Sequence, residues 1–360
     1  MNKQRLLVIA AGGVLGLLAV VLVSTGNPAN MGYCIACFLR DISGGLGLHR
    51  AAPVQYIRPE IIGLVLGAFI AAQATKEFRT VGGSSSFTRF TLGFFSMMGM
   101  LVFLGCPVRA VLRLAGGDLN AGVGLIGLVV GVAIGVWFLK AGFTLGRAVP
   151  QQKSNGYLFT VFMVLLFILL LMKPAFLFFS EQGPGYMHAP VWIALAAGLA
   201  VGVLAQRSRL CMVGGIRDFI ILRDGHLLYG FIAIFVVALV GNLAVGAFHI
   251  GFAGQPVAHT DGLWNFLGMV LAGWAVVLLG GCPLRQLVAA AEGNTDCAVT
   301  IMGFMVGAAV SHNFGLAASA DGVPPAGQIA VVLGMLVVFA IGIINRPAVV
   351  TGGVSVGKGS

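Results

Sequence analysis

The chain has 360 residues, of which 59% are hydrophobic and only 9% carry a charge, and its mean hydropathy is +1.01. Soluble domains contain roughly 25% charged residues, so a water-exposed globule is excluded and an all-α polytopic membrane protein is predicted. The net charge of +10 does not indicate nucleic-acid binding, because no lysine or arginine cluster lies on an extended polar module.

The apolar stretches predict ten membrane-spanning helices. In chain order they cover residues 5–24, 58–75, 88–105, 121–141, 156–173, 190–206, 227–248, 263–281, 298–317 and 326–345. The first stretch has some features of a cleaved signal peptide. The duplication described below needs it as the partner of 190–206, so we expect it to be the first spanning helix.

Four shorter segments interrupt this pattern. Residues 32–50 and their counterpart 209–224 are too polar to cross a membrane and too apolar to be free loops. After the third and eighth spans come short helical runs, 108–115 and 284–292, which end at glycines suited to helix C-caps. We expect all four segments to enter the membrane and return as re-entrant loops.

Two different cysteine motifs each occur twice. Gly105-Cys106-Pro107-Val108-Arg109 recurs as Gly281-Cys282-Pro283-Leu284-Arg285, and Cys34-x5-Arg40-Asp41 recurs as Cys211-x5-Arg217-Asp218. The offsets are 282 − 106 = 176 and 211 − 34 = 177 residues. Nearly equal offsets for unrelated motifs indicate an internal duplication, with repeats at 1–175 and 176–360 in a single membrane domain.

Each repeat contains five spans, and because five is odd the second repeat must cross the membrane in the opposite direction. With a cytoplasmic N-terminus, six of the 21 lysines and arginines lie outside and the other 15 lie inside. Cytoplasmic segments carry the excess of positive charge in membrane proteins. We therefore predict two inverted repeats with both termini in the cytoplasm. Duplicated, inverted halves with broken helices near the midplane are typical of transporters.

The Gly-Cys-Pro-x-Arg motif suits the binding of an anion. Its glycine permits a sharp turn, and its proline suits the first position of a new helix. That helix directs its positive N-terminus toward Cys106 or Cys282, and Arg109 or Arg285 adds a full charge. The field favours a thiolate or a bound anion. Two such sites facing each other predict an anion path near the middle of the membrane.

The Cys-x5-Arg-Asp segments predict local pairing of the adjacent charges, which would allow each segment to lie partly in the membrane. The first segment has a second thiol, Cys37, where Gly214 stands in the repeat. Cys37 is a candidate redox partner of Cys34, although a single C-x-x-C is a weak signal. Buried cysteines usually act as small hydrophobic residues. The repeat favours function for Cys106 and Cys282, and leaves Cys34 and Cys211 evenly balanced. Cys297 has no counterpart and is interpreted as packing.

No metal site, cofactor or direct ATP drive is expected. The six histidines show no spacing typical of zinc ligands. The phosphate-binding sequence G-x-x-x-x-G-K-[ST] does not occur.

These motifs resemble the YeeE/YedE family of sulfur-compound transporters, over essentially the whole chain. The runs Gly26–Asp41, Gln55–Glu60 and Arg113–Asn120 resemble more narrowly the YedE branch, which is associated with selenium metabolism. The resemblance implies an hourglass-like helical bundle in a bacterial inner (plasma) membrane. It also implies that thiosulfate passes between loop cysteines through S–H hydrogen bonds without covalent chemistry. Cys37 and Cys211 are variations of this sequence that leave a softer or more reduced substrate open.

The expected function is that of a membrane transporter, not an enzyme, that takes up a small sulfur- or selenium-containing anion through a central cysteine-lined constriction. The expected path residues are Cys34, Cys37, Cys106, Arg109, Cys211, Cys282 and Arg285, supported by Arg40, Asp41, Gly105, Pro107, Arg217, Asp218, Gly281 and Pro283. The expected partners are the anion, the lipid bilayer and a cytoplasmic sulfur- or selenium-carrier protein. The alternative is a membrane thiol–disulfide oxidoreductase that uses Cys34 and Cys37.

Overall fold

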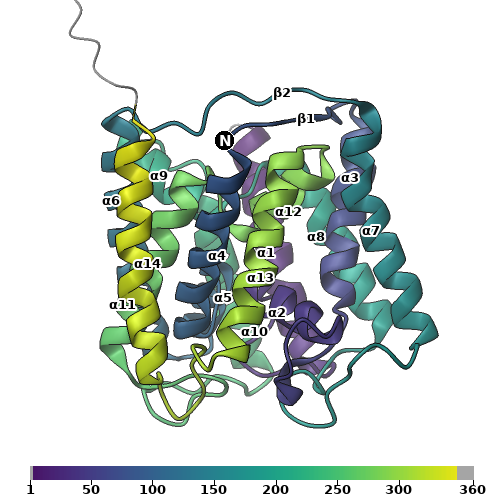
Figure 1. Ribbon diagram of the computed structural model, residues 1–360. Helices are drawn as coiled ribbons and strands as arrows, with labels where there is room; N and C mark the ends of the chain where they lie inside the picture. Colours follow the sequence, from purple (N-terminus) through teal and green to yellow (C-terminus); the bar gives the residue numbers. More distant parts are fainter. Residues whose placement is uncertain (1–2, 347–360) are drawn as a thin grey trace, which may run out of the picture.

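The computed structural model describes residues 3–346, and helices make up most of this part of the chain (Figure 1). The first half contains α1 (Lys3–Ser24), α2 (Ile35–Gly45), a 3-10 turn (Ala52–Val54), α3 (Pro59–Ala74), β1 (Val81–Gly82), α4 (Ser86–Phe103), α5 (Pro107–Ala115), α6 (Leu119–Lys140), β2 (Val149–Pro150) and α7 (Lys153–Met172). The second half contains α8 (Val191–Ser208), α9 (Met212–Leu222), α10 (Leu228–Ala244), α11 (Gly262–Leu278), α12 (Pro283–Ala291), α13 (Thr295–Asn313) and α14 (Pro325–Ile344).

Each of the ten expected spans corresponds to one long helix: α1, α3, α4, α6, α7, α8, α10, α11, α13 and α14. In the described part of the chain, nine helical segments are long and apolar enough to cross a membrane, and α10 is a shorter apolar helix of 17 residues. The prediction of an all-α polytopic membrane protein is therefore confirmed.

Glycines allow the long helices to approach one another closely. A Cβ atom built on Gly131 of α6 would lie 2.2 Å from the carbonyl oxygen of Val270 in α11. On the other side of the molecule, a Cβ atom on Gly67 of α3 would lie 2.2 Å from the carbonyl oxygen of Leu199 in α8. Both separations are far below van der Waals contact, so only glycine permits these crossings, as is usual between membrane helices.

The contacts among α1–α6 and α8–α13 keep the same pattern when each helix of the first half is replaced by its counterpart in the second half, α1 by α8, α2 by α9 and so on. The contact between α3 and α8 becomes that between α10 and α1, and the contact between α6 and α11 becomes that between α13 and α4. The short helices follow the same rule, because α5 packs on α6 and α10 whereas α12 packs on α13 and α3. The two halves are therefore interleaved rather than placed side by side.

Backbone hydrogen bonds repeat the same exchange. In one place, Arg79 N donates to Glu292 O at 2.9 Å and Val81 N donates to Gly293 O at 3.3 Å. In the other, His249 N donates to Gly116 O at 2.9 Å and Gly251 N donates to Gly117 O at 3.0 Å. The C-terminal end of α12 is thus fixed by the loop that follows α3, and the C-terminal end of α5 by the loop that follows α10.

The outer helices α7 and α14 depart from this exchange. Helix α7 packs on α3, α12 and α13, whereas α14 packs on α4 and α11. Residues 141–152 cross the top of Figure 1 to reach α7, and on the way β2 pairs with β1. The loop after β1 is held by Asp296, whose carboxylate accepts hydrogen bonds from Gly83 N and Ser84 N.

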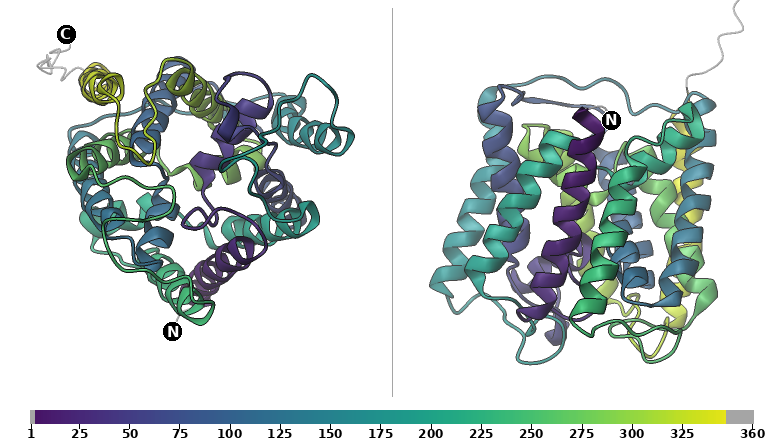
Figure 2. Two further views of the ribbon diagram at one scale, coloured as in Figure 1. Left: turned by 90° about the horizontal axis from the view of Figure 1, so that it is seen from below. Right: turned by 180° about the vertical axis from the view of Figure 1, so that it is seen from behind.

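Short segments lie inside a ring of long helices, as the view from below shows (Figure 2). Helices α2 and α5 lie in the lower half of Figure 1, whereas α9 and α12 lie in the upper half. Most of α7 and α14 faces outward, while α4–α5 and α11–α12 are almost wholly buried. The two Gly-Cys-Pro motifs are therefore carried by the most enclosed part of the fold.

Candidate functional site

Three thiols of the first half form one buried cluster. Cys34 precedes α2 and Cys106 precedes α5, and their sulfur atoms are 3.9 Å apart. Cys37 lies in the first turn of α2, with its sulfur 2.9 Å from that of Cys34. All three residues are at most 1% exposed. The two motifs, far apart in the sequence, thus meet at the N-termini of two short helices.

Arg109 brings a positive charge to this cluster. Its Nη1 donates to the sulfur of Cys37 at 3.1 Å, while Nε and Nη2 donate to the carbonyl oxygens of Asn30 and Val257, each at 2.9 Å. Arg109 is fully buried, and among residues 3–346 no carboxylate lies within ion-pair distance of it. Its charge therefore remains available to an anion beside the thiols.

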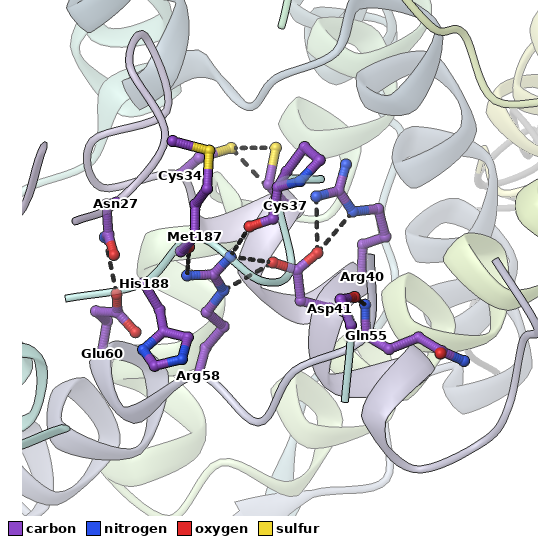
Figure 3. Close-up of polar contacts among 12 residues, drawn as sticks. Asn27, Cys34, Cys37, Arg40, Asp41, Gln55, Arg58, Glu60, Met187 and His188 are labelled. Atoms are coloured by element: carbon purple, nitrogen blue, oxygen red, sulfur yellow. Dashed lines mark hydrogen bonds and ion pairs between the residues drawn. The ribbon is translucent and has the colours of Figure 1, made fainter. Parts of the chain in front are cut away.

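A second group of buried charges holds α2 in place (Figure 3). Arg40 pairs with Asp41 at 2.7 Å, as the local pairing in the motif predicts. The other Asp41 oxygen accepts from Arg58 at 2.7 Å, and Arg58 also donates to the carbonyl oxygens of Met187 and Pro184. This triad fixes α2 against the start of α3 and the loop that joins the two halves.

The second half contains a simpler thiol pair. Cys211 precedes α9 and Cys282 precedes α12, and their sulfur atoms are 3.8 Å apart. The Cys211 sulfur accepts from Gly214 N at 3.2 Å, just as that of Cys34 accepts from Cys37 N at 3.3 Å. The repeated motifs therefore give the same geometry twice, with one thiol fewer in the second half.

Arg285 was expected to place its charge beside the neighbouring thiol, but its guanidinium pairs with a carboxylate instead. Its Nη2 donates to Oε2 of Glu292 at 2.9 Å and its Nη1 to Oε1 at 3.4 Å. Glu292 also accepts from Arg209 at 2.6 Å. The reason is that Glu292 follows Arg285 by two helical turns and lies on the same helix face.

The second Arg-Asp pair also lies in a different environment from the first. Arg217 donates to Asp218 at 2.8 Å, as the motif predicts, but the two side chains are 29% and 26% exposed. Neither residue has a further ion-pair partner in the described chain. These two supporting residues thus lie at a surface, whereas Arg40 and Asp41 lie in the interior.

The sharp turn before each cysteine is made one residue earlier than expected. The left-handed residues are Leu104, with φ 62°, and Gly280, with φ 86°. Gly105 and Gly281 have another role, because a Cβ atom on either would lie 3.0 Å from the side chain of the motif arginine. The glycine of the motif therefore makes room for the arginine stem, and the proline begins the helix as expected.

Sequence reasoning missed four residues that shape these sites. They are Arg58, Glu292, Asn27 and Glu60. Asn27 donates to Glu60 Oε1 at 2.9 Å and to Gly32 O at 3.3 Å, which fixes the segment before Cys34 (Figure 3). Spacing could have revealed Glu292, seven residues after the motif arginine. Nothing in the local sequence indicates the partner of Arg58.

The short helices of the two halves touch one another, since α2 contacts α12 and α5 contacts α9. We call Cys34, Cys37 and Cys106 the first thiol group and Cys211 and Cys282 the second thiol group. Both thiol groups are therefore carried on helices that meet inside the ring. Among residues 3–346 no three His, Cys, Asp or Glu side chains are arranged to hold a metal ion. Thiols, helix N-termini and arginines together suit a small, polarisable anion.

Comparison with known proteins gives a consistent result. Residues 207–355 match the family described as "Sulphur transport". Thiosulfate transporter TsuA of Escherichia coli is 29% identical over 131 residues, which is 35% of this chain and 36% of that protein. Thiosulfate transporter TsuA of Spirochaeta thermophila is 27% identical over 118 residues, covering 33% of this chain and 35% of that protein. The chain thus spans about a third of the length of each relative in these matches. The second half of this helical membrane protein is therefore similar to the sulphur transport family.

Proposed function

We propose that this protein is a transporter of the bacterial inner membrane that takes up a small sulfur- or selenium-containing anion through a constriction lined by the two thiol groups. The observation that carries the proposal is the repeated geometry, with sulfur pairs 3.9 and 3.8 Å apart at the buried N-terminal ends of short helices. The names of the two relatives support a thiosulfate-like substrate. The function is transport rather than catalysis.

The two halves, 1–175 and 176–360, are inverted repeats about an axis in the membrane plane. This is supported by the helix contacts and backbone hydrogen bonds that exchange between halves, and by the opposite levels of α2 and α9 in Figure 1. The described chain starts and ends at the same level, which supports termini on one side. The distribution of lysine and arginine assigns that side to the cytoplasm.

Transport of an anion through the constriction requires binding sites that hold the anion only weakly. Thiols donate weak hydrogen bonds and are polarisable, so they bind a soft anion without trapping it. Arg109 and the N-termini of α2 and α5 offset the charge at the first thiol group. Two modest sites in succession favour conduction over retention. Each half therefore contributes one step of the same path.

The extra thiol of the first half bears on the choice between sulfur and selenium. Cys37 lies between the Cys34 sulfur and the Arg109 guanidinium, at 2.9 and 3.1 Å. An anion at this point meets three thiols instead of two. Selenium is larger and more polarisable than sulfur, so this cluster favours a selenium-containing anion more than the second pair does.

Uptake into cells tests the proposal. Cells that produce the wild-type protein should accumulate radiolabelled thiosulfate or its selenium analogue, selenosulfate, and each unlabelled anion should compete with the other. Cys106→Ala should abolish the uptake, whereas Cys297→Ala, which removes a buried thiol outside both groups, should not. No accumulation above cells lacking the protein would refute transport of these anions.

One observation favours the alternative of a thiol–disulfide oxidoreductase. The Cys34 and Cys37 sulfur atoms are close enough for two thiols to lose two electrons and two protons to an acceptor and form a disulfide. Alkylation followed by mass spectrometry reports the state of this pair. A disulfide in the active protein, together with unchanged uptake by Cys34→Ser, would favour the oxidoreductase.

A further inference from the structure

The carboxylate of Glu292 joins two arginines at the end of α12. Arg285 holds it with both Nη atoms, at 2.9 and 3.4 Å, and Arg209 holds it at 2.6 Å. Arg209 also donates a hydrogen bond to the carboxylate of Glu77, which accepts another from Arg207 at 3.1 Å. Two guanidinium groups that face one carboxylate from different elements have the arrangement of an oxyanion site.

This arrangement adjoins the second thiol pair. A Cβ atom on Gly281 would lie 3.0 Å from Cγ of Arg285 and 3.8 Å from the sulfur of Cys211. The arginine stem thus lies against the turn that carries Cys282, beside Cys211. An anion that leaves the thiols toward this end meets the Arg285 guanidinium within the length of one side chain.

The backbone contact made at position 292 does not require the glutamate side chain. Its counterpart in the first half, seven residues after Arg109, is Gly116. The backbone oxygens of both residues accept equivalent hydrogen bonds, from Arg79 N and from His249 N, each at 2.9 Å. The first half thus makes this backbone hydrogen bond with a glycine. The negative charge of Glu292 therefore calls for a reason other than this contact.

The cluster also opens toward water. The side chains of Glu292, Arg285 and Arg209 are 12%, 22% and 47% exposed. Arg209 lines a cavity of about 290 Å³ at this end of the molecule, and its polar lining includes Arg207, Ser208, Asp218, Asp224 and His226. An anion displaced from the arginines would enter a polar, solvent-connected space.

We propose that Arg285 and Arg209 form an anion site at the cytoplasmic mouth, and that Glu292 occupies it as a tethered competitor whenever the substrate is absent. The ligand class is a small oxyanion with two or more negative oxygens, such as thiosulfate or its selenium analogue. The anion binds by displacing the Glu292 carboxylate, and the return of the carboxylate releases the anion. The inference rests on the proposed function, because it assigns the release step of the same path.

A tethered competitor has a specific kinetic signature. Removing its charge leaves the arginines free, so the anion binds more tightly and leaves more slowly. Glu292→Gln should lower KM for uptake about threefold to tenfold, as expected for loss of one competing charged hydrogen-bond partner. The maximal rate should fall by a similar factor. A merely structural role would lower the rate without lowering KM.

The experiment compares uptake kinetics of thiosulfate for wild type, Glu292→Gln, Glu292→Asp and Glu181→Gln. Glu292→Asp retains the charge and should restore KM toward the wild-type value. Glu181→Gln removes one negative charge from the loop between the halves and should leave both parameters unchanged. In the Arg285→Gln background, Glu292→Gln should lower KM less than in the wild-type background, because one of the two arginines is gone.

Binding of thiosulfate to the purified proteins, measured by calorimetry, gives a second readout that does not depend on turnover. Tighter binding by Glu292→Gln than by wild type is the expected result. Equal or weaker binding, or an unchanged KM in a variant that remains folded by thermal unfolding, overturns the inference. Absence of uptake by the wild type would instead refute the proposed function, so the two failures are distinguishable.

Discussion

The two halves use the same motif arginine in different ways. Arg109 is completely buried and donates to a thiol and two carbonyl oxygens, whereas Arg285 is 22% exposed and paired with Glu292. In the part of the chain that the structure describes, the first half holds its positive charge without a carboxylate partner, whereas in the second half Glu292 neutralises the corresponding charge. The two halves therefore share the geometry of the thiol sites but differ at single positions, such as Gly116 and Glu292, that change the surroundings of the motif arginine.

The largest difference between the halves should appear in their Arg-Asp pairs. Asp41→Asn leaves Arg40 and Arg58 buried without a counter-charge and should destabilise the protein by about 3–5 kcal/mol. The matched change Asp218→Asn affects a partly exposed pair and should cost less than about 1 kcal/mol. Thermal unfolding of the purified proteins measures both. Equal costs would show that the halves are not different in this respect.

The motif arginines provide the next comparison. Arg109→Gln deprives two buried carbonyl oxygens and a thiol of their donor, so we expect a loss of about 1–3 kcal/mol in stability and of most uptake. Arg285→Gln should leave stability near that of wild type and mainly raise KM. Uptake kinetics combined with unfolding curves separate the two effects. The same profile for both variants would contradict a fixed and an exchangeable arginine.

A smaller effect is expected at the thiol that only the first half has. Cys37→Ala removes one weak donor and should change the ratio of selenosulfate to thiosulfate uptake about twofold to fivefold in favour of thiosulfate. Competition between the two labelled anions measures this ratio. An unchanged ratio would show that the third thiol does not select the substrate.

The smallest effect concerns Glu77, in the loop after α3. Burial raises the pKa of Glu77, but the hydrogen bond from Gln206 and the charges of Arg209 and Arg207 outweigh burial, so the pKa lies below the ordinary value of 4.5. The charged form therefore stabilises the fold above pH 4.5, and this contribution is lost as the pH falls through the lowered pKa.

Glu77→Gln should consequently reduce stability at neutral pH by less than about 1 kcal/mol, since the pair is partly exposed. The difference from wild type should shrink below pH 4.5. Unfolding of both proteins over a pH series tests this. A difference that grows at acidic pH would contradict the assignment of the interaction to the charged carboxylate.

Much of the fold follows from sequence because hydropathy alone defines a membrane span. All ten expected spans and the short helices after Cys106 and Cys282 occur where hydropathy and Gly-Pro signals place them. These features depend on local chemistry that is repeated in the chain. The pairing of Cys34 with Cys106 and of Cys211 with Cys282 was not predicted, because the motifs led us to expect only that the two Gly-Cys-Pro sites would face each other.

The partners of the charged residues could not be predicted in the same way. Arg58 reaches Asp41 because α3 starts beside α2, and the path of α7 depends on how 141–152 crosses the molecule. Such contacts depend on tertiary packing, which hydropathy does not encode. The left-handed turn at Leu104 was also hidden, because leucine rarely adopts that conformation and gives no local signal.

The central claim is that both thiol groups lie on one path, and the most direct test is uptake by Cys106→Ala, Cys282→Ala and the double variant, with Cys297→Ala as the control. Sites in series act as a unit, so each single variant should lose at least about tenfold in uptake and the double variant should be no worse than the poorer single. If each single variant instead retained about half of the uptake and only the double variant lost it, the halves would form two independent paths and the account would be wrong.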